Sequence, residues 1–285
     1  MNKPIIIEEI SKAKLTQPII KQFYASILAG ILIGIAYTAT YLVIVNTGAN
    51  NETISMLYSW LGSVIFGIGL LSCFMLGANL FTVNCVGFVC CLHKRIKRKW
   101  LFINLLITFF GNYIGSIIVA ILIFLLPVFS GSDGEWFKIN QVTINFINLI
   151  SKKINMPFWQ VLIGGIFCNI LVIGSLIAWI IFQNKIASII IILLLIGLFT
   201  LTGYQHIVAN MFSTTLAWLL TTLPNPDHLE FVKWTTSVYG KLFYSCFLFT
   251  TIGNFIGGIF LLWIYLAINV HSSKKTKIDP PSTSK

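Results

Sequence analysis

The chain has 285 residues, of which 57% are hydrophobic and 9% charged, and its mean hydropathy is +0.89. Soluble globular domains carry about 25% charged residues, so this composition excludes an ordinary soluble enzyme or binding domain. The formal net charge is +11, but the basic residues gather in polar connections and tails. Charge in those places orients a membrane protein, so we expect a lipid bilayer, and no nucleic acid, as the partner of this chain.

The N-terminal segment, residues 1–22, is more polar than the long apolar run after it. Residues 1–15 hold Glu8 and Glu9 among several lysines and have no apolar core. We therefore do not expect a cleavable signal peptide. The segment is predicted to be a cytoplasmic amphipathic helix that lies on the membrane surface.

Six apolar segments come next, and long unbroken runs of this kind indicate transmembrane helices rather than barrel strands. They cover residues 23–45, 57–92, 101–126, 158–182, 187–223 and 242–268. Four of them have an ordinary length for one crossing, which needs about 20 residues. The second and fifth are too long, and polar residues and glycine interrupt each near its middle, at 77–84 and 201–212.

The two interrupted segments allow six crossings, with one broken helix each, or eight crossings, with two helices each. Six crossings place 14 of the 19 Lys and Arg residues on the cytoplasmic side, including the loop 94–99. Eight crossings move that loop outside and leave 11 inside. The positive-inside rule favours six crossings with both termini cytoplasmic. We predict one all-α, six-span transmembrane domain over 23–268 in the cell membrane and a polar cytoplasmic tail over 269–285.

An internal repeat relates the two halves of this domain, 23–126 and 158–268. The pattern Gly-x-polar-x-x-x-x-Asn begins at Gly77 and again at Gly203, and Gly-Asn-aromatic-Ile-Gly begins at Gly111 and again at Gly253. Three crossings per half make such a repeat inverted, and broken helices at membrane depth must line a cavity or pack inside protein. The glycine-asparagine pieces are interpreted mainly as faces for close helix packing.

One histidine is embedded in the interrupted fifth segment. Of the four histidines, only His206 lies within an apolar run. An ionisable side chain at that depth indicates a functional site, although a hydrogen bond to a neighbouring helix would also explain it. The apolar segments contain no Asp or Glu, and no Cys has metal-site spacing. We therefore expect no enzyme, no metal and no cofactor.

Through these motifs, the chain resembles the formate/nitrite transporter family over about residues 12–268. The matching pieces are 79–84, 168–172, 203–212 and the two glycine-asparagine pieces. The resemblance implies an aquaporin-like protomer fold, a homopentamer and one substrate path in each protomer. The implied substrates are small monovalent anions such as formate, nitrite, lactate or hydrosulfide.

The resemblance also implies roles for individual residues. The central site along the path falls on His206, Thr82 and Asn169. An outer apolar constriction falls on Phe66, Val172 and Phe199, and an inner one on Leu70, Cys73 and Leu80. Basic residues that attract anions fall on Lys14 at the inner mouth and Lys153 at the outer mouth, with Lys12 and Lys152 as the competing assignments.

Three residues depart from the family pattern. Asn79 stands where the family usually has an acidic residue, Val83 where it has a small residue, and Gln205 where it has glutamate. The last two affect the expected substrate size and the hydrogen bonds around the central histidine.

These assignments suggest a mechanism. The lysines concentrate anions at each mouth, and the falling dielectric inside favours the protonated form of the substrate. The substrate takes a proton from solvent or by way of His206 and crosses as a neutral acid. Thr82, Asn169 and the half-helix ends replace its lost hydrogen bonds to water. Two questions stay open, namely whether His206 transfers the proton or only polarises the site, and which anion is carried. The alternative function is an aquaporin-like channel for small neutral solutes.

Overall fold

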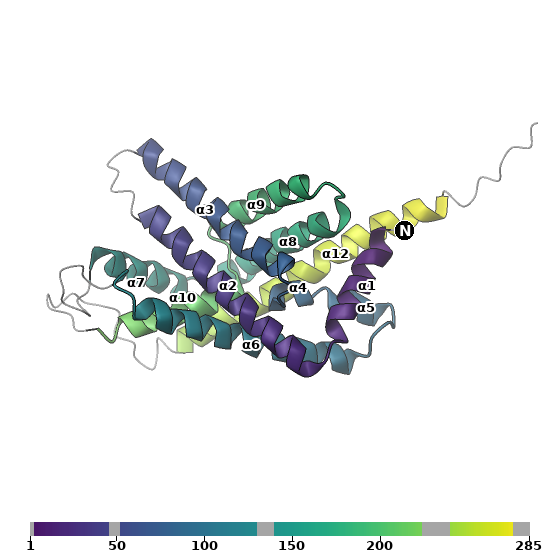
Figure 1. Cartoon of the computed structure of the whole chain (residues 1–285), viewed down its shortest axis with the longest axis horizontal. Helices are drawn as coiled ribbons and strands as arrows, with labels where there is room; N and C mark the ends of the chain where they lie inside the picture. Colours follow the sequence, from purple (N-terminus) through teal and green to yellow (C-terminus); the bar gives the residue numbers. More distant parts are fainter. Residues whose placement is uncertain (1–2, 46–51, 130–139, 224–239, 276–285) are drawn as a thin grey trace, which may run out of the picture.

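The computed structural model describes residues 3–45, 52–129, 140–223 and 240–275, which form a bundle of helices (Figure 1). In chain order these are α1 (Lys3–Leu15), α2 (Ile19–Val45), α3 (Glu52–Met75), α4 (Phe81–Asn84), α5 (Gly87–Leu92), α6 (Arg98–Phe124), α7 (Gln141–Ile154), α8 (Phe158–Ile181), α9 (Lys185–Leu201), α10 (Ile207–Leu220), the π-helical segment η1 (Leu242–Phe249) and α12 (Thr250–Lys275). No strand occurs within the described ranges. Most of the predicted polar tail, 276–285, lies outside them.

The long helices coincide with the predicted apolar segments. Five stretches are long and apolar enough to cross a membrane, namely α2, α3, α6, α8 and the continuous stretch Leu242–Asn269. The fifth apolar segment is divided into α9 and α10, and the second continues beyond α3 as the short helices α4 and α5. The chain is therefore a helical membrane protein that crosses the bilayer several times.

Both interrupted segments end their first helix in the same way. After α9, Gly203 has a φ of +70°, and the N–H of the next residue donates back to the Phe199 carbonyl at 3.1 Å. After α3, Gly77 has a φ of +69°, and the next N–H donates to the Cys73 carbonyl at 2.9 Å. Positive φ is strained for residues that carry a Cβ, so glycine allows the helix to end in this closed turn.

One asparagine secures the turn between α9 and α10. The Asn254 side chain accepts a hydrogen bond from the Ile207 N–H at 2.9 Å. Its amide group donates to the carbonyls of Gln205 and Gly165, both at 2.8 Å. Because these backbone groups stand at a helix break, the side chain supplies the partners that the missing helical turn would have provided.

Asn112 does the same for the turn between α3 and α4. It accepts from the Phe81 N–H at 2.9 Å and donates to the carbonyls of Asn79 and Ser26, both at 2.8 Å. The two asparagines occupy matching places in the repeat. The interpretation of the glycine-asparagine pieces as packing faces was therefore incomplete, because the asparagines hold the breaks.

The glycines beside these asparagines do form packing faces. A Cβ on Gly30 of α2 would overlap the Asn112 carbonyl on α6, and one on Gly115 would overlap the Ile27 carbonyl. In the second half, a Cβ on Gly257 of α12 would overlap the Ile166 carbonyl on α8. The α2–α6 and α8–α12 pairs thus approach at backbone distance, as small residues four apart allow.

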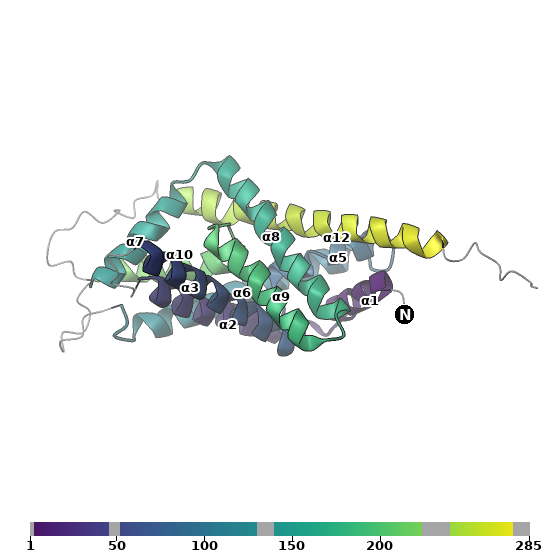
Figure 2. The same ribbon diagram turned by 90° about the horizontal axis from the view of Figure 1, so that it is seen from above.

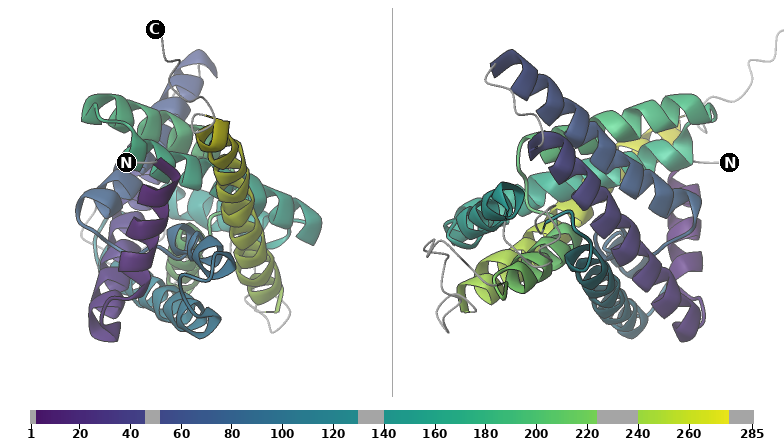
Figure 3. Two further views of the ribbon diagram at one scale, coloured as in Figure 1. Left: turned by 90° about the vertical axis from the view of Figure 1, so that its right-hand side faces the viewer. Right: turned by 60° about the vertical axis from the view of Figure 1, so that its left-hand side comes forward.

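The two ends of the bundle differ. Figures 1 and 2 show α1 and α5 at one end, near the C-terminal end of α12, and α7 at the opposite end. The end-on view in Figure 3 places α1, in purple, and α12, in yellow, toward the viewer. One face of α1 is buried, with Ile7 fully enclosed, and Glu8 pairs with Arg95 and His93 at 2.7 Å each. The N-terminal helix therefore packs one face against the rest of the bundle and leaves its other face exposed.

No helix is predicted between residues 126 and 158, yet α7 forms there. Its apolar residues recur at helical spacing, and Phe146, Ile147, Ile150 and Ile154 are buried. The Asn140 side chain caps its first turn by accepting from the Thr143 N–H at 2.9 Å. This amphipathic pattern was readable from the sequence, but the helix is short and polar enough that a search for long apolar runs passes over it.

Candidate functional site

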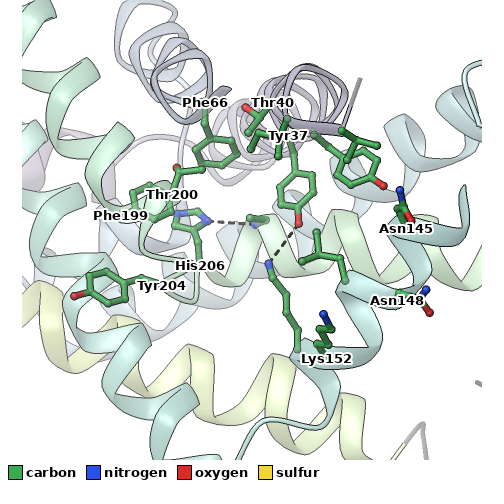
Figure 4. Close-up of a pocket in the computed structure, with 17 residues that line it drawn as sticks. Tyr37, Thr40, Phe66, Asn145, Asn148, Lys152, Phe199, Thr200, Tyr204 and His206 are labelled. Atoms are coloured by element: carbon green, nitrogen blue, oxygen red, sulfur yellow. Dashed lines mark hydrogen bonds between the residues drawn. The ribbon is translucent and has the colours of Figure 1, made fainter. Parts of the chain in front are cut away.

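A cavity of about 520 Å³ opens beside α7 and reaches the break between α9 and α10. Figure 4 shows His206 at its inner end, close to Phe66 and Phe199, with Lys152 and Asn148 on the opposite side. The apolar part of its wall comes mainly from α2, with Phe66 of α3 and Phe199 of α9, and α7 contributes most of the polar part. The residues that line the cavity include no Asp or Glu and two lysines, Lys152 and Lys153, so its electrostatic character is positive.

The two ring nitrogens of His206 make different hydrogen bonds, one to the backbone of α10 and one to Thr82. Its Nδ1 accepts from the Ala209 N–H at 3.2 Å, which makes His206 the N-cap of α10. A backbone N–H can only donate, so Nδ1 carries no proton and the neutral ring is protonated at Nε2. Nε2 lies 3.3 Å from the Thr82 hydroxyl and thus donates to it. The side chain is 3% exposed, so both bonds are formed away from bulk water.

Thr82 lies on α4 and is fully buried. Asn169 of α8 supports its backbone, because the Asn169 amide group donates to the Thr82 carbonyl at 3.0 Å and to the Asn254 carbonyl at 2.5 Å. The Asn169 Oδ1 atom is buried and has no hydrogen-bond partner among the described residues. Asn169 therefore lies next to Thr82, with its amide group bonded to the carbonyls of Thr82 and Asn254 and its oxygen without a partner among the described residues.

The predicted outer constriction residues lie in one apolar cluster. The rings of Phe66 and Phe199 meet edge to face with centroids 5.5 Å apart, and Phe199 stacks on the His206 ring at 5.9 Å. Both phenylalanines line the cavity. Val172 is buried in the same cluster, but it is not among the residues that line the cavity.

The predicted inner constriction residues are also enclosed. Leu70, Cys73 and Leu80 are each at most 2% exposed and belong to the cluster that contains Phe66 and Phe199. Leu80 occupies the repeat position that corresponds to His206, immediately before its half-helix. The two breaks therefore present different groups, an apolar side chain from one and an imidazole from the other.

The structure gives the two outer lysines different surroundings. Lys152 and Lys153 both border the cavity, but only Lys153 is held, with its Nζ 3.4 Å from the Tyr37 hydroxyl and 5.4 Å from the Tyr37 ring centre. Tyr37 was not among the predicted site residues. A tyrosine within an apolar helix gives no signal by itself, and its partner lies on the helix that the hydropathy pattern missed.

Lys14 lies at the opposite end, beside the first break. Its Nζ donates to the Ala78 carbonyl at 3.3 Å, where a cation stabilises the end of α3. Burial lowers the pKa of the Lys14 ammonium, and Cys73 nearby opposes this effect. Lys14, and not Lys12, borders two smaller cavities of about 20 and 260 Å³.

The three departures from the family pattern lie at the breaks. Gln205 holds the turn before α10, donating to the Gly203 carbonyl at 3.0 Å and accepting from the Asn210 amide at 3.3 Å. Both side-chain polar atoms of Asn79 are buried without a partner among the described residues. Val83 is buried next to Thr82, at 3% exposure. An uncharged amide side chain therefore stands at each of the two breaks.

A sequence model described as formate/nitrite transporter matches residues 5–268 of this chain. Among curated relatives, the formate channel FocA of Escherichia coli K12 is 27% identical over 278 residues, which cover 93% of this chain and 94% of the relative. The formate-nitrite transporter of Plasmodium knowlesi is 26% identical and covers 89% of this chain and 78% of the relative.

Solved structures share the fold. A structure described as a pentameric formate channel with formate bound superimposes with a TM-score of 0.70 at 24% identity, covering 88% of this chain and 98% of that one. A structure described as an FNT family ion channel gives a TM-score of 0.73 at 21% identity, covering 93% and 98%. At these identities the similarity establishes the helical fold.

Proposed function

The chain belongs to the formate/nitrite transporter family, and from that premise we propose that it carries a small monovalent anion such as formate, nitrite or lactate across the membrane. Transport is channel-like, uses one path in each protomer and moves a proton with the anion. The observation that carries the proposal is the outer cavity, which begins beside Lys152 and Lys153 and ends at His206.

The apolar residues beyond the cavity decide the form in which the substrate crosses. Moving an isolated carboxylate into an apolar site costs tens of kcal/mol by a Born estimate. Protonating a carboxylate with a pKa of about 4 at pH 7 costs about 4 kcal/mol, at 1.36 kcal/mol per pH unit. The second cost is far smaller. The substrate therefore passes Phe66 and Phe199, and then Leu70, Cys73 and Leu80, as the neutral acid.

His206 acts in this scheme as a hydrogen-bond donor. An imidazolium would place a proton on Nδ1, facing the Ala209 N–H, and α10 would lose its cap. The two lysines that border the cavity also disfavour a further positive charge on its wall. The Nε2–H, with the Thr82 hydroxyl beside it, replaces the hydrogen bonds that the acid loses on leaving water. The proton itself comes from solvent in the outer cavity.

Lys14 and the smaller cavities form the inner end of the path. A lysine whose Nζ is fixed at the Ala78 carbonyl keeps a positive charge at the start of the inner constriction. Asn169 completes the central site, because its Oδ1 has no partner among the described residues and can accept a hydrogen bond from the O–H of a neutral acid.

The proposal includes the membrane topology and the assembly of the protein. We place six crossings over 23–268, as two inverted halves, 23–126 and 158–268, with α4–α5 and α10 as half-helices. Both termini lie in the cytoplasm and the protein lies in the cell membrane, as the distribution of Lys and Arg favours. A homopentamer accounts for the many exposed apolar side chains on the long helices, some facing lipid and some a neighbouring subunit.

Uptake into proteoliposomes tests the function. Full-length protein is reconstituted, and entry of radiolabelled formate, lactate and glycerol is followed against protein-free liposomes. We expect formate and lactate entry above that control and no protein-dependent glycerol entry. Rapid glycerol entry without acid uptake would instead establish the channel for neutral solutes.

A further inference from the structure

Tyr37 and Lys153 form a pair at the outer cavity that the sequence did not suggest. Tyr37 lies on α2 and Lys153 near the end of α7, and the Lys153 Nζ is 3.4 Å from the Tyr37 hydroxyl oxygen. An ammonium has only hydrogens to offer, so the phenol oxygen must be the acceptor of this bond. The Tyr37 O–H therefore remains a hydrogen-bond donor, and no described residue accepts from it.

The pair is held in place by packing. The Tyr37 ring contacts Phe66 at a centroid distance of 6.2 Å, Phe146 at 6.4 Å and Phe212 at 5.7 Å. Phe146 belongs to α7, the helix that carries Lys153, so the same contact fixes the lysine relative to the tyrosine. Two donors at fixed separation bind an anion more strongly than two mobile ones, because less side-chain freedom is lost on binding.

The charge of Lys153 is not neutralised within the described structure. The ion pairs found there all involve Glu8 or Glu9 at the opposite end of the bundle. The cavity that Lys153 borders is lined by no carboxylate. Its ammonium is therefore available to an anion from solvent.

We infer that Tyr37 and Lys153 together form a receiving site for a small anion with two acceptor oxygens, in front of the Phe66 ring. One oxygen of a carboxylate or nitrite accepts from the Lys153 ammonium and the other from the Tyr37 hydroxyl. Because Tyr37 packs edge-on against Phe66, the bound anion lies next to the outer constriction. The inference rests on the proposed transport function and adds Tyr37 as a residue that contacts the substrate and positions Lys153.

The chemistry predicts a preference among substrates. Formate, nitrite and lactate offer two oxygens and can accept from both donors at once. Hydrosulfide has one acceptor atom and cannot bridge them in the same way. Loss of the phenol hydroxyl should therefore weaken the binding of carboxylates more than that of hydrosulfide.

Initial rates of formate uptake in proteoliposomes test this site through the variant Tyr37→Phe, which keeps the ring contacts and removes only the hydroxyl. We expect the KM for formate to rise about tenfold or more with little change in maximal rate, as loss of one hydrogen bond to a charged partner predicts. The KM for hydrosulfide should change less. The matched control is Tyr113→Phe, the same change at a half-buried tyrosine packed against Phe247 away from the cavity.

A double-mutant comparison separates the shared site from two independent effects. Lys153→Gln should also raise the KM for formate, and adding Tyr37→Phe to it should have little further effect, because the two residues bind one anion. An unchanged KM in Tyr37→Phe, a fall in maximal rate alone, or fully additive effects would overturn the inference. The absence of formate uptake by the unaltered protein would instead refute the proposed function.

Discussion

At the scale of single residues, the central site depends on how His206 divides its two ring nitrogens. Nδ1 caps α10 through the Ala209 N–H, and Nε2 faces Thr82. The sequence indicated His206 as the one histidine within an apolar run, and it indicated Thr82 through the resemblance to the transporter family. It did not indicate the cap or the Tyr37 contact, since both depend on which groups the fold brings within 3.5 Å.

The two bonds of His206 can be separated by mutation. His206→Ala removes both bonds. Loss of the cap should lower the free energy of unfolding by about 1 kcal/mol and hence the unfolding midpoint in detergent. Loss of the bond to Thr82 should slow formate uptake. His206→Asn restores a good N-cap but does not reach Thr82. Its midpoint should return close to that of the unaltered protein while uptake stays about tenfold slower, the effect of losing one hydrogen bond of about 1.4 kcal/mol.

Melting curves followed by tryptophan fluorescence, together with initial uptake rates, measure both effects. Uptake by His206→Asn at the unaltered rate would contradict a donor role for Nε2. A midpoint as low as that of His206→Ala would contradict the capping role.

At the scale of elements, the molecule is built around two helix breaks that the same devices hold. The sequence located the interruptions at 77–84 and 201–212, because each lies in an apolar segment too long for one crossing and contains a glycine. Both features can be recognised from neighbouring residues alone. Asn112 and Asn254 were recognised as a repeated motif but not as clamps, since their partners lie 31 to 86 and 47 to 89 positions away along the chain. Helix α7 carried no long-run hydropathy signal. The last apolar segment did, but hydropathy does not indicate that its first eight residues, Leu242–Phe249, form a π-helix.

Removal of one clamp should destabilise the protein strongly. Asn254→Leu leaves the Ile207 N–H and the carbonyls of Gln205 and Gly165 without their partner. Buried unpaired groups cost about 1–3 kcal/mol each, so we expect a loss of at least about 3 kcal/mol. Asn269→Leu is the control, because the Asn269 amide group bonds the Tyr265 carbonyl of its own helix.

Thermal unfolding of both variants in detergent makes the comparison. The Asn254→Leu protein should unfold at a clearly lower temperature than the control and should carry formate poorly. Equal midpoints for the two variants would show that Asn254 does not hold the break.

At the scale of the whole molecule, lysines lie at both ends of the proposed path and apolar side chains lie between them. Lys153 borders the outer cavity, and Lys14 borders the inner ones. The total charge of +11 alone says little about this arrangement, because most basic residues lie in polar connections and tails away from the cavities. In the proposed function, this arrangement attracts anions at the mouths and rejects the charged form in the middle.

Attraction at the mouth should depend on ionic strength. Salt shortens the range of exposed charges, to about 10 Å at 0.1 M, so formate uptake at low concentration should slow as an inert salt is added. Lys153→Gln should flatten this dependence, whereas Lys241→Gln, which removes a positive charge that bonds Asn155 outside the cavity, should leave it nearly unchanged. Equal salt dependence in all three proteins would exclude Lys153 as the attracting charge.

The most direct measurement follows proton movement and voltage together. Liposomes that contain the protein and a pH-sensitive dye receive external formate at equal pH on both sides, with the membrane potential set by potassium and valinomycin and with protein-free liposomes as the control. Crossing as the neutral acid predicts that the protein accelerates acidification of the lumen and that the rate is the same at positive and negative potential. Formate entry without acidification, at a rate that increases when the lumen is made positive, would show that the charged anion crosses and would contradict the neutral-acid mechanism.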